Sequence, residues 1–118
     1  MLVRILSTAL LVTSIASAAE AALWSPPLHG GLGTHLTCRV MNLASTARSV
    51  TIQVADGYGK VLANTAVSLQ PGHSVSATTA KNDTGYCWVL GIGKKESRIT
   101  FSVERDDDFS TLTAVQIR

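Results

Sequence analysis

The stretch LTCRVMNLASTARSVTIQV, residues 36–54, decides the fold of this chain. Apolar and polar side chains alternate in it twice, over residues 36–41 and again over residues 50–54, with a break rich in small residues between them. An alternation of period two places one set of side chains on a core and the other toward solvent, which is the pattern of a half-buried β-strand. The stretch therefore predicts two consecutive strands, each with one buried face.

The same alternation continues outside this stretch. Residues 99–103 repeat it, with apolar side chains at every second position. Beyond the glycine-rich residues 30–33, no segment spaces its apolar residues for three helical turns. The chain is therefore predicted to contain seven or eight strands and no long helix. Weaker runs of strand-forming residues cover residues 61–65, 67–69, 75–79, 87–90 and 113–117.

Turn-forming residues separate the predicted strands. Two glycines within residues 56–59 accept a positive φ angle and close a hairpin. Pro71 and Gly72 fit the central positions of a type II turn, because proline presets φ near −65° and glycine accepts the positive φ that follows. Strands that recur about every ten residues with such turns indicate antiparallel pairing. The predicted fold class is all-β, one antiparallel β-sandwich of seven to eight strands.

Length and composition narrow the class of protein further. The chain has 118 residues, which is enough for one domain. Hydrophobic residues make up 46% and charged residues only 15%, and this balance excludes intrinsic disorder. The net charge is +2 and the basic residues do not cluster, so nucleic acid is not an expected partner.

Residues 1–21 follow the plan of a secretory signal peptide. A single cation is followed by an apolar stretch over residues 5–15 and then by small residues. Cleavage is expected after Ala21, with Ala18 as the alternative, and the apolar stretch is too short to cross a bilayer. We expect one β-sandwich domain over residues 22–118, secreted or periplasmic, with no membrane span once the leader is removed. The alternative is that the same residues form a buried N-terminal helix.

Cys38 and Cys87 are the two cysteines of the chain. Both occupy positions that the alternation turns inward, and disulfides persist in the oxidising compartments that an exported chain enters. They are 49 residues apart, whereas a redox-active pair is typically closely spaced, as in a C-x-x-C motif. We therefore predict a structural disulfide between the two sheets.

Several of these features together resemble a known architecture. An early core cysteine, a glycine-rich hairpin, residues 69–72 (LQPG) and residues 83–87 (DTGYC) are similar to those of immunoglobulin-like and fibronectin type III-like sandwiches. The layout resembles small secreted bacterial β-sandwich proteins, most of which have no assigned function. This resemblance implies the two-sheet fold and leaves the function open.

Residue types that carry chemistry are few and scattered. His29, His35 and His73 show no metal-ligand spacing, and no serine lies in a nucleophile elbow. Glu104 and residues 106–108 place four carboxylates close together, which fits either a flexible calcium loop or a solvated turn. The solvated turn is the favoured interpretation. The sequence therefore predicts no catalytic residue, no cofactor-binding residue and no metal site.

The run around the second cysteine contains a candidate binding surface. Inward orientation of Cys87 places the alternate residues of that run on the opposite face. These residues are Tyr86, Trp88 and Leu90. An exposed apolar stripe of this kind favours a partner, either a protein or a sugar face. The alternative, which we favour at this point, is that residues 23–28 fold over the stripe and bury it.

These observations lead to three functional hypotheses. The first is a non-enzymatic secreted or periplasmic module that binds a partner or contributes to an assembly. The second is a small inhibitor of a secreted enzyme that presents residues 56–60 or residues 91–95 as a rigid loop. The third is a hydrolase with an unrecognised site. The oligomeric state does not follow from the sequence.

Overall fold

The structure of the protein is a computed structural model that describes residues 22–80 and 84–117. The predicted signal peptide at residues 1–21 lies outside the described residues. Within the described part, no helix is both long enough and apolar enough to span a lipid bilayer.

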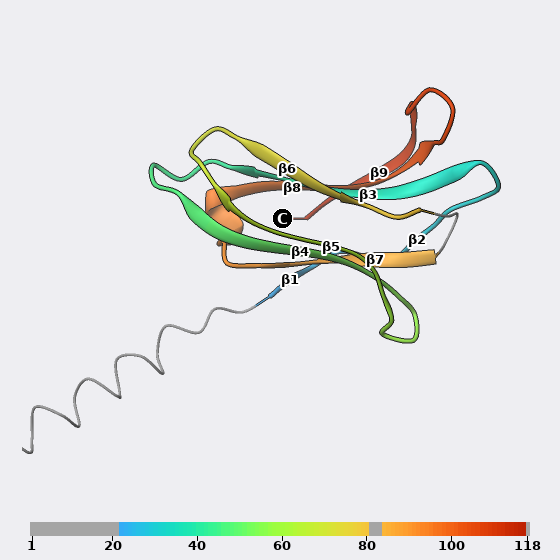
Figure 1. Cartoon of the computed structure of the whole chain (residues 1–118), viewed down its shortest axis with the longest axis horizontal. Helices are drawn as coiled ribbons and strands as arrows, with labels where there is room; N and C mark the ends of the chain where they lie inside the picture. Colours follow the sequence, from blue (N-terminus) through green and yellow to red (C-terminus); the bar gives the residue numbers. More distant parts are fainter. Residues whose placement is uncertain (1–21, 81–83, 118) are drawn as a thin grey trace, which may run out of the picture.

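Two antiparallel sheets form the molecule, and they lie as two layers in Figure 1. Sheet A has the strand order β1, β7, β4, β5, with β2 also paired to β7, and sheet B has the order β6, β3, β8, β9. The strands of sheet A are β1 (Leu23–Trp24), β2 (Leu28–His29), β4 (Arg48–Asp56), β5 (Val61–Leu69) and β7 (Thr84–Leu90). Those of sheet B are β3 (Thr34–Asn42), β6 (Ser74–Thr78), β8 (Ser97–Arg105) and β9 (Thr111–Ile117), and a short 3-10 turn, η1 (Lys94–Glu96), precedes β8.

The predicted all-β antiparallel sandwich is confirmed, with nine strands in place of seven or eight. The two additional strands, β1 and β2, are only two residues long, and their sequence is too short to show an alternation. Residues 61–65 and 67–69, predicted as separate runs, form the single strand β5. Short edge strands of this kind arise from backbone pairing, which side-chain patterns do not reveal.

The core lies between the two sheets and follows the period-two pattern. Every second residue of β3, β4 and β8 is buried, so each of these strands gives one face to the core. Part of the opposite face of β3 and β8 is buried as well, at His35, Thr37, Ser102 and Glu104. The largest fully buried side chains are Phe101, Leu36, Ile52, Ile92, Ile99, Val40, Val50, Val54 and Val89.

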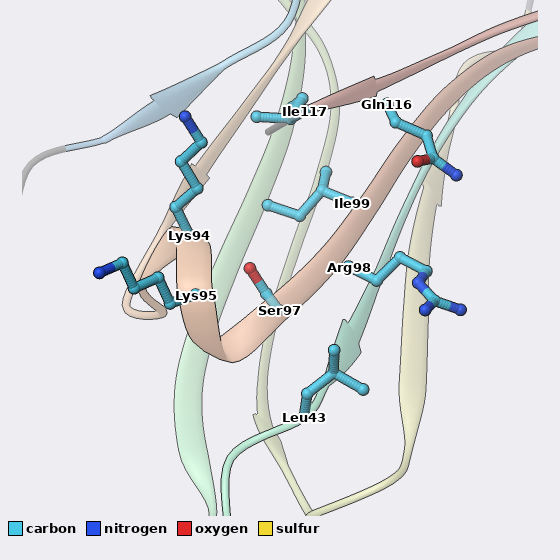
Figure 2. A pocket seen from close by; sticks show the side chains of 8 residues that line it. All are labelled: Leu43, Lys94, Lys95, Ser97, Arg98, Ile99, Gln116 and Ile117. Carbon is cyan, nitrogen blue, oxygen red and sulfur yellow. The ribbon is translucent and has the colours of Figure 1, made fainter.

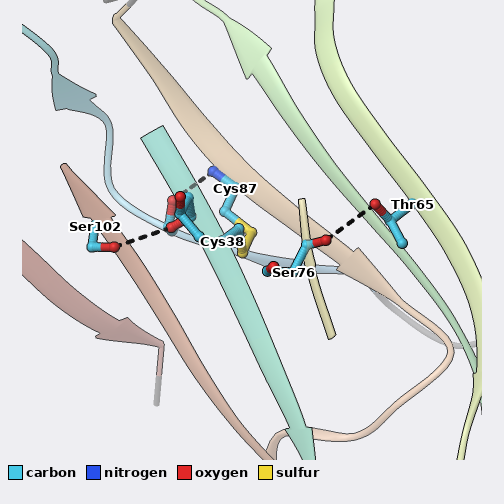
Figure 3. The surroundings of a disulfide bond; sticks show 7 residues. Cys38, Thr65, Ser76, Cys87 and Ser102 are labelled. Carbon is cyan, nitrogen blue, oxygen red and sulfur yellow. Dashed lines mark hydrogen bonds between the residues drawn. A yellow bond between two sulfur atoms is a disulfide. The ribbon is translucent and has the colours of Figure 1, made fainter. Parts of the chain in front are cut away.

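The predicted disulfide joins the two layers. Cys38 on β3 and Cys87 on β7 are bonded, their Cα atoms are 6.0 Å apart, and neither residue is exposed to solvent. Figure 3 shows this bridge together with the contact beside it in which the Thr65 hydroxyl donates to the Ser76 carbonyl oxygen at 3.2 Å. The sheets are therefore linked covalently at the core and by a hydrogen bond between two edge strands.

The predicted turns also form. Gly72 has φ of 77°, and the His73 N–H donates to the Gln70 carbonyl at 3.1 Å, which is the geometry of a type II turn. In the turn between β4 and β5, one carboxylate oxygen of Asp56 accepts hydrogen bonds from the Tyr58 and Lys60 N–H groups, each at 2.9 Å. This carboxylate holds the hairpin tip in one conformation.

The order of the strands departs from that of immunoglobulin domains in one respect. The disulfide strands β3 and β7 lie on opposite sheets, and β4 pairs with β7, as in that fold. The strand after β7, however, is β8, which crosses back to pair with β3. An immunoglobulin domain keeps its last strand beside the second cysteine strand. Here the N-terminal strands β1 and β2 occupy that edge of β7 instead.

Candidate binding face

A row of side chains crosses the outer face of sheet A. Trp24 on β1 is paired with Trp88 on β7, Trp88 with Gln53 on β4, and Gln53 with Asn64 on β5. Residues directly opposed on antiparallel strands present their side chains on the same face. Tyr86 lies on the same face as the row, two residues from Trp88 along β7. We call the surface formed by Trp24, Tyr86, Trp88, Gln53 and Asn64 the aromatic face.

Trp24 contacts both of the other aromatic rings of this face. The Trp24 ring centroid is 5.3 Å from that of Tyr86 and 5.6 Å from that of Trp88, with interplanar angles of 35° and 37°. Trp24 is 55% exposed, whereas Tyr86 and Trp88 are partly buried. The Ser25 hydroxyl accepts from the Cys87 N–H at 2.7 Å, and the Ser25 N–H donates to the Cys87 carbonyl at 2.9 Å. These two bonds hold Trp24 against β7.

The structure places the predicted stripe on the outer face and revises the interpretation of the N-terminal segment. Tyr86, Trp88 and Leu90 alternate with buried residues of β7, as the sequence indicates. The segment over residues 23–28 does not lie across the stripe. It pairs with the edge of β7 and extends the sheet, so that Trp24 covers part of the stripe and is itself the most exposed ring of the face. That the stripe binds a partner stays a prediction.

A shallow hollow of about 190 Å³ lies on this face. It is smaller than the roughly 300–1,000 Å³ of a pocket that encloses a small molecule, so it is an open surface feature and not an enclosing pocket. Its lining residues carry no charge: Trp24, Gln53, Ala55, Gly59, Val61, Tyr86 and Trp88.

One polar side chain of the face, Gln53, has a hydrogen-bond partner, whereas the indole N–H of Trp88 has none among the described residues. The Gln53 amide donates to the Asn64 side-chain oxygen at 3.1 Å, which orients both amides along the row. The indole N–H of Trp88 is buried and has no acceptor among the described residues. A buried donor without an acceptor costs free energy, so the face retains an unused hydrogen-bonding group beside its aromatic rings.

The structure brings some of the predicted chemistry-bearing residues together and separates others. His35 lies between the carboxylates of Glu104 and Asp106, whereas His29 contacts Thr84 and His73 is exposed in a turn. Among the described residues, no group of three histidine, cysteine or acidic side chains is arranged to hold a metal ion.

The remaining aspartates of the acidic turn form its own hydrogen bonds. Asp107 accepts from the Asp108 N–H at 2.7 Å, and Asp108 accepts from the Ser110 N–H at 3.0 Å. The hydrogen bond from the Ser110 backbone lowers the pKa of Asp108 below its usual value. These are hydrogen bonds within the turn itself. That the acidic run is a solvated turn and not a calcium loop stays a prediction.

A larger open groove, of about 450 Å³, lies at the opposite end of the sandwich, between the start of β8 and the end of β9. Figure 2 shows Ile99 and Ile117 at its centre, with the side chains of Lys94 and Lys95 directed to one side and Arg98 to the other. The three cations diverge, so they do not converge on one anionic group. This groove therefore lacks the arrangement of the aromatic face, where rings and amides share a single row.

The fold and the aromatic face define the class of protein: a small disulfide-linked, all-β sandwich with a sheet face that carries aromatic side chains. Comparison with protein-family models and with curated proteins gives no match. Among solved structures, the chain is similar to Thermotoga maritima 1070, with 12% identity and a TM-score of 0.55, over 84% of this chain and 91% of the other. It also aligns with a CBM4 at 15% identity and a TM-score of 0.38, over 80% of this chain and 82% of that one. The first likeness supports the fold alone, and the second is too low to carry an argument.

Proposed function

We propose that the chain is an exported, non-enzymatic binding module and that its aromatic face binds a neutral carbohydrate. The observation that carries this proposal is the row of Trp24, Trp88, Gln53 and Asn64, which places two indole rings and two side-chain amides side by side on one sheet face.

The composition of the row suits a sugar. The C–H face of a pyranose ring is apolar and packs on an aromatic ring, while its hydroxyl groups need donors and acceptors at the edge. Trp24 supplies an exposed ring, and the amides of Gln53 and Asn64 supply both donors and acceptors. Adjacent strands are about 4.8 Å apart, so a row across four strands extends roughly 14 Å. This length suits a short stretch of a polysaccharide lying perpendicular to the strands.

The charge of the hollow favours a neutral ligand. Its lining residues are all uncharged, so the face offers no cationic partner to a carboxylate, sulfate or phosphate group. Protein-binding hot spots, in contrast, are enriched in arginine as well as in aromatic residues. A neutral polysaccharide is therefore the ligand class that the face fits best.

The proposal that the protein is exported rests on two features. The leader plan of residues 1–21 is that of a secreted chain, and the disulfide between Cys38 and Cys87 is of a kind that persists in the periplasm or outside the cell.

Affinity electrophoresis in gels that contain neutral polysaccharides tests the ligand. We expect retardation of the wild-type protein by at least one such polysaccharide and its loss in Trp24→Ala. The matched control is Tyr58→Ala, which removes an aromatic side chain that is 99% exposed and lies outside the hollow. Equal mobility of the wild type and Trp24→Ala in every gel would count against the proposal, and so would an equal loss in the Tyr58 variant.

A second candidate, an inhibitor that presents residues 56–60, has one observation in its favour. The tip residue Tyr58 is almost fully exposed, and the Asp56 carboxylate holds the turn around it. Rigid presentation of an exposed aromatic side chain lowers the entropic cost of binding to another protein. Recovery of a single secreted enzyme by the wild type, with inhibition lost in Tyr58→Ala and kept in Trp24→Ala, would favour this function over carbohydrate binding.

A further inference from the structure

A histidine on the outer face of sheet B is buried between two carboxylates. His35 is 4% exposed, although it lies on the face of β3 that is directed away from the core. Its Nε2 atom is 3.1 Å from a carboxylate oxygen of Glu104, and its Nδ1 atom is 2.7 Å from one of Asp106. We call His35, Glu104 and Asp106 the histidine latch.

The carboxylate of Glu104 is held on the β8 side. Glu104 is paired with His35 across β3 and β8, and its side chain is only 10% exposed. The Thr37 hydroxyl donates to the same Glu104 oxygen that faces His35, at 3.1 Å, and the Ser102 hydroxyl lies 3.5 Å from the other oxygen. The Thr37 hydroxyl therefore directs the oxygen that faces His35, and the carboxylate cannot turn away from His35 without losing this bond.

Asp106 belongs instead to the turn between β8 and β9. The latch thus fixes this turn to β3 through a side chain that is itself 52% exposed. A backbone bond supports the same junction, because the Asp106 N–H donates to the Gly33 carbonyl oxygen at 2.9 Å. The turn is consequently tied to the segment that precedes β3.

Phe109 shows that the conformation of this turn depends on its contacts. It is the one non-glycine residue in the described part of the chain with a positive φ, 58°, and this region is unfavourable for an aromatic residue. Its N–H donates to the Arg105 carbonyl at 3.0 Å, and its ring packs edge-on against the His35 ring with centroids 5.5 Å apart. The His35 ring is therefore one of the contacts that hold Phe109 in this conformation.

The geometry of the latch requires a particular protonation state of His35. A carboxylate is an acceptor only, so each ring nitrogen that faces one must carry a hydrogen to form the bond. Only the doubly protonated imidazolium ring donates from both nitrogens, and a neutral ring leaves one carboxylate facing a lone pair. Within the described residues, the titratable groups that bond to the ring are Glu104 on β8 and Asp106 on the turn. The other contacts from neighbouring elements are the uncharged ring of Phe109 and, through Thr37, the hydroxyl of Thr78 on β6.

We propose that the histidine latch is a proton-controlled device that orders the β8–β9 turn. With His35 protonated, both bonds form and the turn is fixed. When His35 loses its proton, only one ring nitrogen can donate. The bond to the buried Glu104 is then kept, because water can replace the ring at the half-exposed Asp106, and the turn is released. Histidine is the side chain whose charge ordinarily changes near neutral pH, so a change of pH is the perturbation that tests the device. The released segment borders a cleft of about 270 Å³ that is lined in part by Leu32, Arg105, Asp107 and Leu112, and the shape of this cleft therefore depends on pH. This device lies on the sheet opposite the aromatic face and is independent of carbohydrate binding.

Hydrogen exchange of individual amides, measured by NMR at pH 5.5 and pH 8, tests the proposal. A hydrogen bond to a charged group is worth enough that its loss opens the site about tenfold or more. We expect the protection factor of the Asp106 amide, corrected for the intrinsic pH dependence of exchange, to fall by about that factor at pH 8. The Gly59 amide is the internal control, because it is bonded to the Asp56 carbonyl at 3.1 Å in the turn between β4 and β5, which contains no histidine.

Variants separate the latch from a general effect of pH. His35→Asn is expected to abolish the difference between the two pH values, whereas the matched control His73→Asn, at an exposed histidine, keeps it. If His35→Asn does not fold, Asp106→Ala removes one partner at a half-exposed position, and it too is expected to abolish the difference. The ring nitrogen shifts of His35 give a second measurement and should show both nitrogens protonated at pH 5.5. A neutral ring at that pH, an equal change at Gly59, or a difference that persists in Asp106→Ala would overturn the proposal.

Discussion

The contribution of the disulfide to stability is the most direct test of how this sandwich is held together. The perturbation is the double variant Cys38→Ala with Cys87→Ala, which removes the bridge without leaving a free thiol. On the chain-entropy model, a cross-link between residues 49 positions apart lowers the entropy of the unfolded chain by an amount worth about 4 kcal/mol at 25 °C. Both cysteines are fully buried, so the variant also loses a small amount of packing in the core.

Thermal unfolding followed by circular dichroism measures this effect. For a domain of this size, 1 kcal/mol corresponds to a change in Tm of about 4–8 °C, so the double variant should melt about 15 °C or more below the wild type. Treatment of the wild type with a reductant that reaches the buried sulfurs should lower Tm by a similar amount. If the double variant melts within about 4 °C of the wild type, hydrogen bonds and packing already hold the two sheets together, and the role assigned to the bridge is wrong.

Three further predictions follow from individual contacts. Gly91→Ala should lower the free energy of unfolding by several kcal/mol, because φ is +91° and the added Cβ would lie 1.9 Å from the main-chain oxygen of Ser49 on β4. The control is Gly59→Ala. Gly59 has a similar φ of +83° but lies in open space, so this variant should lose only about 1–2 kcal/mol. Equal costs would show that the close approach at Gly91 is not real. Asn42→Ala should lower the free energy of unfolding by about 2–4 kcal/mol, because the buried amide of Asn42 donates to two carbonyl oxygens, at 2.9 and 3.0 Å. A loss below about 0.5 kcal/mol would show that these two hydrogen bonds do not stabilise the fold. Iodide should quench the wild-type tryptophan fluorescence mainly through Trp24, because its ring is the more exposed of the two indoles. In Trp24→Phe, the remaining emission from Trp88 should be quenched less. Unchanged quenching would place the exposed indole at Trp88.

Asn42 shows where sequence reasoning missed a structural residue. It ends β3, and besides donating from its amide it accepts from the Ala44 N–H at 2.8 Å, so one side chain organises the connection to β4. Asn42 was assigned no role from the sequence, because asparagine is common in the connections between strands. The one sequence feature that could have pointed to this role is a polar residue at the end of an alternating run. Its partner, the carbonyl oxygen of Leu69, lies 27 residues away and becomes a neighbour only when β5 returns along β4.

The aromatic face was predicted in part. The alternation around Cys87 placed Tyr86 and Trp88 outward, and the same alternation placed Gln53 outward on its own strand. Trp24 was expected to lie over this surface, and its actual place beside Trp88 was not foreseen. The pairing of β1 with β7 is made by main-chain groups, which every residue other than proline offers equally, so no pattern of side chains identifies the register.

The amino acid sequence alone determined the all-β class, the inward position of both cysteines and the turns at residues 56–59 and 71–72, because periodicity and turn preference act between residues that are close along the chain. Tertiary structure alone decided which edge received the N-terminal strands, that β8 crossed to the sheet of β3, and that His35 met Glu104 and Asp106 from about 70 residues away. Such contacts depend on which strands become neighbours. That choice results from the packing of the whole chain, since backbone hydrogen bonds are similar for many alternative strand orders.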